Sequence, residues 1–309
     1  MTSVAVVVPT FRRPDALAAC LEALRVQHRA PDEVVVVTRT DDPDAPVIAA
    51  AAGLLCTVLE LDEPGVLAAM VAGVRATTAG VICFTDDDAV VPATWVAQIA
   101  AALEEHPLVG GIGGRDVIID AGGVPRTEPL TTDVGRVTWF GRHVGNHHIG
   151  TGEPRDVGFL KGVNSGYRRE ALGLPRGLRG TGAQAHFEIA VGRFARSRGW
   201  RLVYDPALAV EHHPAARQGA DQRDEPTRRA VADAAYNLVV AMGGVRGACR
   251  FPYAIALGDR GAPGLLRAAV AAAQGDHATV ARLSPSLRGT TDAAAALLGG
   301  RGVTYETFA

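Results

Sequence analysis

The first hundred residues alternate short, β-branched apolar runs with segments whose apolar residues recur at helical spacing. Apolar runs without polar alternation are typical of parallel strands buried on both faces. This order predicts an α/β fold with a doubly wound, mostly parallel sheet, and right-handed crossovers would place helices on both faces. The expected strands cover residues 3–8, 34–37, 57–61 and 81–84, and the expected helices cover residues 45–52 and 66–76 after a first helix beginning at Pro14.

The pattern loosens after about residue 107. Residues 110–123 are glycine-rich and β-prone, and residues 125–158 form a long loop region that could act as a mobile flap. The chain from residue 226 onward reads as helical. Regular structure is expected at residues 185–198 (helix), 201–204 (strand), 230–242 and 264–274 (helices).

Charge and hydropathy exclude several classes of protein. The 309 residues carry 31 basic and 33 acidic side chains, with no dense basic run, so a surface that tracks nucleic-acid phosphates is not expected. No stretch of about 18 consecutive apolar residues occurs, so no transmembrane helix is expected. The four cysteines lack metal-ligand spacing, which favours a reducing cytoplasm. Peripheral contact with the inner face of a membrane stays open.

The apolar run at residues 81–84 is followed, after Thr85, by three consecutive acids, Asp86, Asp87 and Asp88. In open α/β sheets, ligands bind beyond the carboxyl ends of the strands. Clustered carboxylates repel one another unless a cation lies between them, and Mg²⁺ or Mn²⁺ would also bind substrate phosphates and water. The alternative is a solvated acidic loop, or a cap for a helix near Thr94.

Four motifs in a fixed order give a specific resemblance. They are VVVPTFRRP (residues 6–14), VICFTDDDAVVPATW (81–95), KGVNSGYRREAL (161–172) and RSRGWRLVYDPALAVEHH (196–213). Together they resemble the family 2 glycosyltransferases, which have the GT-A fold. The resemblance implies a hexosyl-type transferase that moves a sugar from a nucleoside-diphosphate sugar to an acceptor hydroxyl with inversion. A uridine donor is the one it favours.

The resemblance divides the chain into two regions. Residues 1–213 would form the GT-A catalytic domain, with a nucleotide-binding half at residues 1–106 and an acceptor-binding half at residues 107–213. Residues 214–309 fall outside the resemblance and would form a C-terminal helical region. A homodimer through these helices is one assembly that they allow.

The resemblance also implies residues that contact the donor. Pro9, Thr10 and Arg13 lie in the loop that contacts the nucleotide. Asn164 lies where the family lines the acceptor and donor-sugar pocket. Lys161 could neutralise the diphosphate.

A divalent metal, Mn²⁺ or Mg²⁺, is part of the same expectation. Asp88 resembles the residue that binds the metal through its carboxylate, and Asp86 the acid that touches the ribose or sugar; Asp87 is grouped with the donor-binding residues. His212 resembles a histidine that completes the metal shell in some GT-A enzymes. The alternative for His212 is an ordinary surface histidine.

The general base is less clearly marked. Many family members carry a Glu-Asp pair before the helix that precedes the last motif, and here that pair is absent. His186 and Glu188 are the nearest candidates for the group that takes the acceptor's proton. Glu188 is preferred because it aligns with the acid that opens the helix; the alternative is a carboxylate that only favours the helix dipole.

Two further departures affect the donor site. The family commonly places an acid at the end of the second strand to hold the base, whereas here Asp41 or Asp42 comes slightly later. Met70 and Val71 stand where an Arg-Asn pair is often found. These changes put uridine specificity in question.

Two other functions compete with glycosyl transfer. A sugar nucleotidyltransferase shares the fold but would carry a glycine-rich loop with a lysine after the first strand, and PTFRRP lacks both. A non-catalytic GT-A homologue that binds a sugar or a partner would suit the absent Glu-Asp pair. A retaining transferase is also open, and the acceptor, whether a glycan, a lipid-linked glycan or a small natural product, is not specified.

Overall fold

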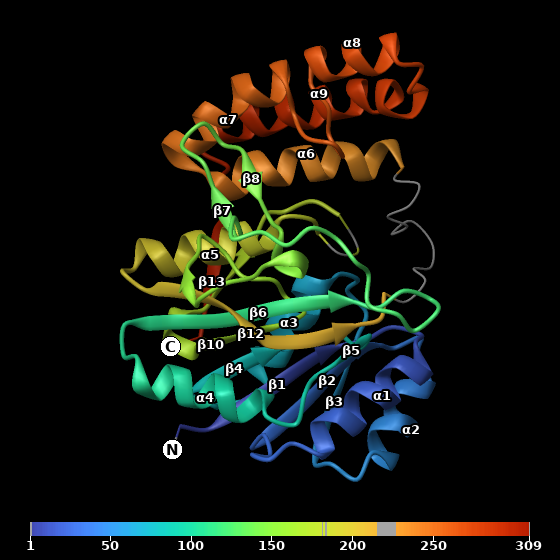
Figure 1. Cartoon of the computed structure of the whole chain (residues 1–309), viewed down its shortest axis with the longest axis vertical. Helices are drawn as coiled ribbons and strands as arrows, with labels where there is room; N and C mark the ends of the chain where they lie inside the picture. The colour runs from blue at the N-terminus through green and yellow to red at the C-terminus, as the bar shows by residue number, and fades with distance from the viewer. Residues whose placement is uncertain (1, 181, 183, 215–226, 309) are drawn as a thin grey trace.

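The computed structural model describes residues 2–180, 182, 184–214 and 227–308. Its centre is a nine-stranded sheet in the order β3-β2-β1-β4-β10-β6-β12-β5, with β9 paired to β12 (Figure 1). The first four strands run parallel, whereas β10 is antiparallel to both β4 and β6. The strands are β1 (Val4–Pro9), β2 (Glu33–Arg39), β3 (Cys56–Leu61), β4 (Val81–Phe84), β5 (Ala89–Val90), β6 (Val109–Ile118), β9 (Arg155–Asp156), β10 (Ser165–Arg168) and β12 (Arg201–His212).

Helices cover both faces of this sheet, which confirms the expected α/β class. Alternate residues of β1 show why the strand is apolar throughout. Val4, Val6 and Val8 pack in one core with α1, α2 and α4, whereas Ala5 and Val7 pack in a second core with α3 and α5. The five helices are α1 (Pro14–Arg25), α2 (Asp44–Ala51), α3 (Val66–Arg75), α4 (Trp95–Glu105) and α5 (Phe187–Ser197).

Two elements have bounds that differ from the sequence expectation. Helix α5 begins at Phe187 rather than at residue 185, because Gln184 and His186 have φ angles of 40° and 72°, outside the helical region. The strand expected at residues 201–204 continues to His212, passing an irregularity between Asp205 and Val210. This extension carries the polar end of β12 to the edge of the sheet where β4 ends.

The long loop region contains short elements that are held by tertiary contacts. β7 (Arg136–Val137) and β8 (His143–Val144) form a hairpin, followed by the 3-10 turn η1 (His147–Ile149). At the hairpin, Arg250 Nη1 donates a hydrogen bond of 3.0 Å to the Gly141 carbonyl, and Phe140 packs against Tyr253. The hairpin is therefore anchored on the C-terminal helices.

The C-terminal helices form a layer beyond α5 in Figure 1. The sequence predicted a helical tail and gave bounds for two of its helices. It gave no bounds for the two that contain an internal proline, Pro252 or Pro285, because proline usually ends a helix. Leu238 and Met242 pack against Phe159 and Ile189, which come earlier in the chain. The C-terminal elements are α6 (Arg228–Met242), α7 (Gly244–Ala256), α8 (Leu265–Ala273), α9 (His277–Leu298) and β13 (Thr304–Thr307). Two short elements lie earlier in the chain, between β10 and α5: η2 (Arg169–Ala171) and β11 (Gly173–Arg176).

The last strand was not expected from the sequence. β13 pairs antiparallel with β11, so the chain returns from the helical layer to the region that precedes it. Arg179 and the buried Asn237 exchange two hydrogen bonds of 2.7 and 2.9 Å across the same boundary. None of the helices in the described ranges has both the length and the apolar character needed to span a bilayer.

Candidate active site

The three acids follow β4 at the carboxyl edge of the sheet and lead directly into β5. Asp87 and Asp88 are buried, and Asp86 is half-buried. The site is therefore built at a strand end, as expected, with carboxylates partly withdrawn from water.

Asp87 fixes the loop that follows β1. Thr10 Oγ1 donates a hydrogen bond of 2.8 Å to Asp87 Oδ2, and Arg13 Nη1 donates one of 2.8 Å to Asp87 Oδ1. Burial raises the pKa of Asp87 to about 6, although the Arg13 charge opposes that shift. Pro9 ends β1 just before this loop. The predicted donor contacts of this loop stay predictions, and the structure adds that Asp87 positions the loop.

His212 reaches the acids through strand pairing. β5 and β12 are antiparallel, with His212 opposite Ala89, and the His213 amide donates to the Asp88 carbonyl at 2.8 Å. As a result, His212 Nε2 lies 3.4 Å from Asp88 Oδ1. Residues separated by more than a hundred positions thus meet because a two-residue strand pairs with the end of a long one.

The resulting group of ligand atoms fits a divalent cation. One ligand atom from each of Asp86, Asp88 and His212 lies within 4.8 Å of the others. Two carboxylate oxygens and an imidazole nitrogen suit Mn²⁺, with positions left for phosphate oxygens and water. Burial lowers the pKa of His212, but Asp116 and Asp88 outweigh burial and raise it to about 9. A cation would have to displace that proton.

Sequence reasoning missed Asp116. This carboxylate is 1% exposed, and its Oδ2 lies 3.8 Å from His212 Nδ1 and 3.7 Å from Lys161 Nζ. Burial would raise the pKa of Asp116, but Lys161 and His212 outweigh it and the pKa is lowered. A carboxylate behind a histidine orients the ring that binds a metal. The available signal was a lone acid in an apolar, glycine-rich strand whose one other charged residue is the neighbouring Arg115.

Asn164 is fully buried and holds three elements together. Its Oδ1 accepts a hydrogen bond of 2.8 Å from Trp95 Nε1. Its Nδ2 donates to the Leu208 carbonyl at 2.7 Å and to the Arg115 carbonyl at 3.2 Å. Asn164 therefore links α4, β6 and β12 beneath the site, and its predicted place in the sugar pocket stays a prediction.

The two candidate bases lie in different surroundings. Glu188 is half-buried in the first turn of α5 and lines a small cavity that also contacts Phe84 at the end of β4. The His186 ring instead packs edge-on against His143 at 4.9 Å. Burial, with help from His143 and Arg250, lowers the pKa of His186 to about 3. A group with that pKa is a weak base at neutral pH, and which of the two residues takes the acceptor's proton stays a prediction.

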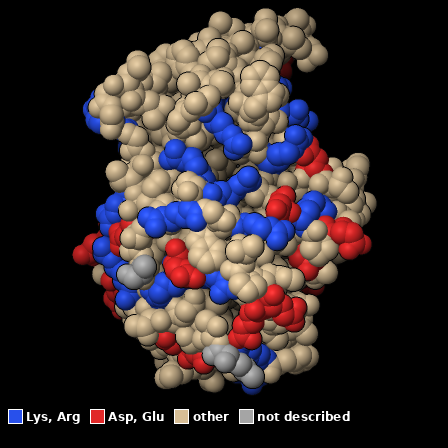
Figure 2. Space-filling model, turned by 90° about the vertical axis from the view of Figure 1, so that its left-hand side faces the viewer, with Lys and Arg blue, Asp and Glu red and all other residues tan. Residues whose placement is uncertain are grey.

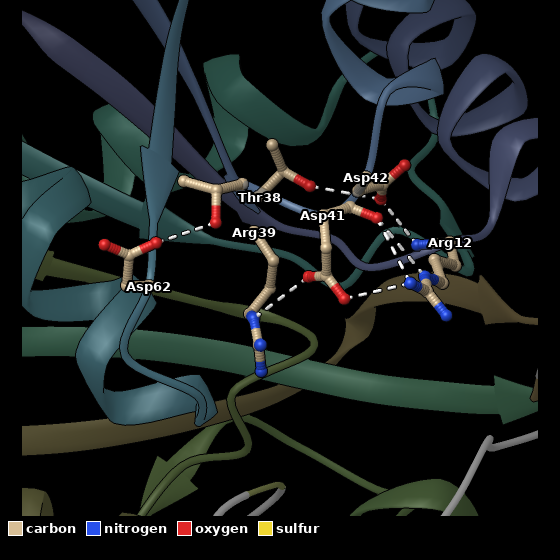
Figure 3. Close-up of polar contacts among 7 residues, drawn as sticks. Arg12, Thr38, Arg39, Asp41, Asp42 and Asp62 are labelled. Carbon is tan, nitrogen blue, oxygen red and sulfur yellow. Dashed lines mark hydrogen bonds and ion pairs between the residues drawn. The ribbon is translucent and has the colours of Figure 1, made fainter.

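Asp41 and Asp42 play different parts at the end of β2 (Figure 3). Asp42 is buried and accepts hydrogen bonds from the Arg12 amide at 2.5 Å and from Thr38 Oγ1 at 3.1 Å. Asp41 lies between two guanidinium groups, 2.9 Å from Arg12 Nη2 and 3.4 Å from Arg39 Nε. Asp42 thus supports the loop after β1, and Asp41 holds two arginines.

Similar solved structures identify the class of fold. One similar structure is the mannosyltransferase PcManGT from Pyrobaculum calidifontis, solved with GDP-Man and Mn²⁺. Its TM-score is 0.54 at 18% identity, and the match covers 97% of this chain and 88% of that one. GalNAc-T7, solved with UDP, GalNAc and Mn²⁺, has a TM-score of 0.55 at 14% identity; the match spans 78% of this chain and 47% of that one. The fold is that of the GT-A glycosyltransferases.

The sequence comparison identifies the family. The profile described as Glycosyl transferase family 2 matches residues 5–173, which is more than half of the chain. The chain belongs to glycosyl transferase family 2, which confirms the resemblance carried by the four motifs. Among curated proteins none matches the sequence.

Proposed function

We propose that this glycosyltransferase moves a hexosyl group from a nucleoside-diphosphate sugar to an acceptor hydroxyl, with divalent-metal assistance and inversion at the anomeric carbon. The observation that carries the proposal is the grouping of Asp86, Asp88 and His212 at the carboxyl edge of a GT-A sheet. The two similar structures were solved with GDP-Man and Mn²⁺ and with UDP, GalNAc and Mn²⁺, which supports the same class of donor and metal.

The residues of the metal group have separate tasks in this proposal. Asp86, Asp88 and His212 would hold the cation, and Asp116 orients the His212 ring. When bound, the cation supplies positive charge against the negative charge that develops on the departing diphosphate. Lys161, one-third exposed beside Asp116, is placed to add a second positive charge at this end of the site.

Glu188 is the proposed base. Its carboxylate would accept the proton of the acceptor hydroxyl while that oxygen forms a bond to the anomeric carbon. The bond from the anomeric carbon to the diphosphate oxygen breaks on the opposite side, and its electron pair leaves with the nucleoside diphosphate. The half-buried setting of Glu188 beside the end of β4 supports this role.

Mass spectrometry of the products after incubation with a panel of nucleotide sugars tests the proposal, with EDTA-treated enzyme in parallel. Asp88→Asn should abolish turnover, whereas the matched change Asp15→Asn on the surface of α1 should leave it unchanged. Full activity in metal-free enzyme would reject the metal assignment. Anomeric analysis of the product distinguishes inversion from retention.

The same assay separates the competing functions. Formation of a nucleotide sugar from a sugar phosphate and a nucleoside triphosphate would support the nucleotidyltransferase. Nucleotide binding without turnover of any donor would support the non-catalytic homologue, which the absent Glu-Asp pair favours.

For the C-terminal helices we propose a homodimer contact through α8. A helix that packs only on its own chain buries its large apolar side chains. Helix α8 instead exposes Leu265, Leu266 and Val270 and buries the small side chains of Ala268 and Ala271. The upper end of the molecule in Figure 2 is mostly uncharged, with Lys and Arg gathered below it. Analytical ultracentrifugation should give a dimer that Leu266→Glu dissociates.

We also propose that the protein is located in the cytoplasm. The four cysteines are free thiols, as expected in a reducing compartment. Peripheral attachment to the inner membrane face is the competing use of the α8 surface. Co-sedimentation of a monomer with anionic vesicles, lost in Leu266→Glu, would favour attachment over the dimer.

A further inference from the structure

The end of β2 carries a cationic and aromatic surface that the proposed mechanism does not use. We call it the base platform and define it as Phe11, Arg12, Arg39 and Asp41. The guanidinium carbons of Arg12 and Arg39 lie 5.0 and 5.3 Å from the centroid of the Phe11 ring. Both distances are within the range of cation–π contact.

The position of the base platform suits a nucleobase. In the sheet order, β1 lies between β4, which Asp86 and Asp88 follow, and β2, which ends at Arg39. Two strand spacings are about 10 Å, a gap that a ribose can bridge between a diphosphate and its base. Phe11 and Arg12 belong to the loop after β1 that Asp87 and Asp42 hold in place.

Arg39 offers hydrogen-bond donors at this position. Asp41 Oδ1 lies 3.4 Å from Arg39 Nε and holds that side of the guanidinium. Within the described part of the chain, the two terminal nitrogens of Arg39 make no hydrogen bond, and in Figure 3 the end of this side chain points away from Asp41. The Arg39 side chain is one-third exposed, so a ligand can reach it.

The donor pattern of a guanidinium discriminates between bases. Two parallel N–H groups match two neighbouring acceptors, and guanine presents O6 and N7 side by side, which is the commonest specific contact of arginine with a base. Adenine places a donor beside its N7 acceptor, and uracil places its N3–H beside each carbonyl, so with either base an N–H of Arg39 would face an N–H of the base. Cytosine also presents two neighbouring acceptors, N3 and O2, so guanine differs from it by its larger ring system. A purine also covers more of an aromatic or guanidinium plane than a pyrimidine does.

We propose that Arg39 selects guanine, so that the sugar donor is a guanosine-diphosphate sugar rather than the uridine donor favoured by the sequence. This inference rests on the proposed function, since it assigns the base of the same donor. In it Asp41 is a positioning residue that fixes the Arg39 guanidinium, and Phe11 supplies the stacking surface.

Isothermal titration of the full chain with GDP, UDP, ADP and CDP in the presence of Mn²⁺ tests the assignment. GDP should bind more tightly than UDP by about tenfold or more, the effect of one good bidentate contact. Arg39→Ala should weaken GDP to the level of UDP and leave UDP unchanged. Arg39→Lys, which keeps the charge but not the planar pair of donors, should lose the preference as well.

The controls separate base selection from general attraction. Arg25→Ala, which removes an exposed arginine of α1 paired with Glu22, should leave the ranking of the four nucleotides unchanged. UDP, ADP or CDP binding as tightly as GDP to the unaltered chain would overturn the guanine assignment, as would a preference retained in Arg39→Lys. Failure of all four nucleotides to bind with Mn²⁺ would instead reject the proposed function, and the base assignment with it.

Discussion

Replacing Asn164 by leucine tests whether this residue holds the site together. The side chain is fully buried and takes part in three hydrogen bonds of 2.7 to 3.2 Å. Leucine has a similar size but no polar atom, so the Trp95 indole nitrogen and the Leu208 carbonyl would lose these partners. A buried polar group left without a partner costs about 1–3 kcal/mol, so two such groups give an expected loss of about 2–6 kcal/mol in the free energy of unfolding.

Urea unfolding followed by circular dichroism measures this loss, and a double-mutant cycle with Trp95→Phe assigns it. Phenylalanine has no indole N–H, so Asn164→Leu should cost less in the Trp95→Phe background, with a coupling of about 1–3 kcal/mol. A loss below about 1 kcal/mol for Asn164→Leu, or strictly additive effects of the two changes, would refute the reasoning.

Three further outcomes are expected. Glu188→Gln should lower kcat by about 10²–10⁴-fold without weakening donor binding, and steady-state kinetics showing near-normal kcat would exclude Glu188 as the base. The pKa of His186 is lowered from 6.5 to about 3 by burial, so the unfolded chain binds a proton first and stability falls as the pH drops below 6.5. The loss should reach about 2 kcal/mol at pH 5 and be absent in His186→Asn, which tolerates the left-handed backbone; equal denaturation profiles for the two chains would contradict this. A Cβ at Gly289 would lie 2.0 Å from the Ala232 carbonyl oxygen, so Gly289→Ala should destabilise the α6–α9 contact by about 1–3 kcal/mol. Gly261→Ala, where no atom lies within 4 Å, is the control, and equal melting temperatures would count against tight packing of these helices.

The end of β2 shows which part of the site the sequence does not specify, and the uridine donor itself stays a prediction. The sequence indicated that the end of β2 departs from the family pattern, and it offered Asp41 or Asp42 as substitutes. In the structure these neighbours point in different directions: Asp42 supports the backbone of Arg12, and Asp41 contacts two guanidinium groups. Neighbouring residues of a loop can point in different directions, and the spacing of apolar residues in the sequence does not predict those directions.

The order of apolar and polar residues along the chain was enough to predict the first half of the fold and the position of the acids. Apolar runs and helical spacing depend on residues close in the chain, so β1 to β4 and the acids after Phe84 could be predicted from them. Contacts between distant segments could not be predicted in this way. The β5–β12 pairing that brings His212 to Asp88, the Asp116 carboxylate behind that histidine, and the return of β13 to β11 each join segments far apart in the chain. The register and close packing that fix those contacts exist only once the whole sheet has formed.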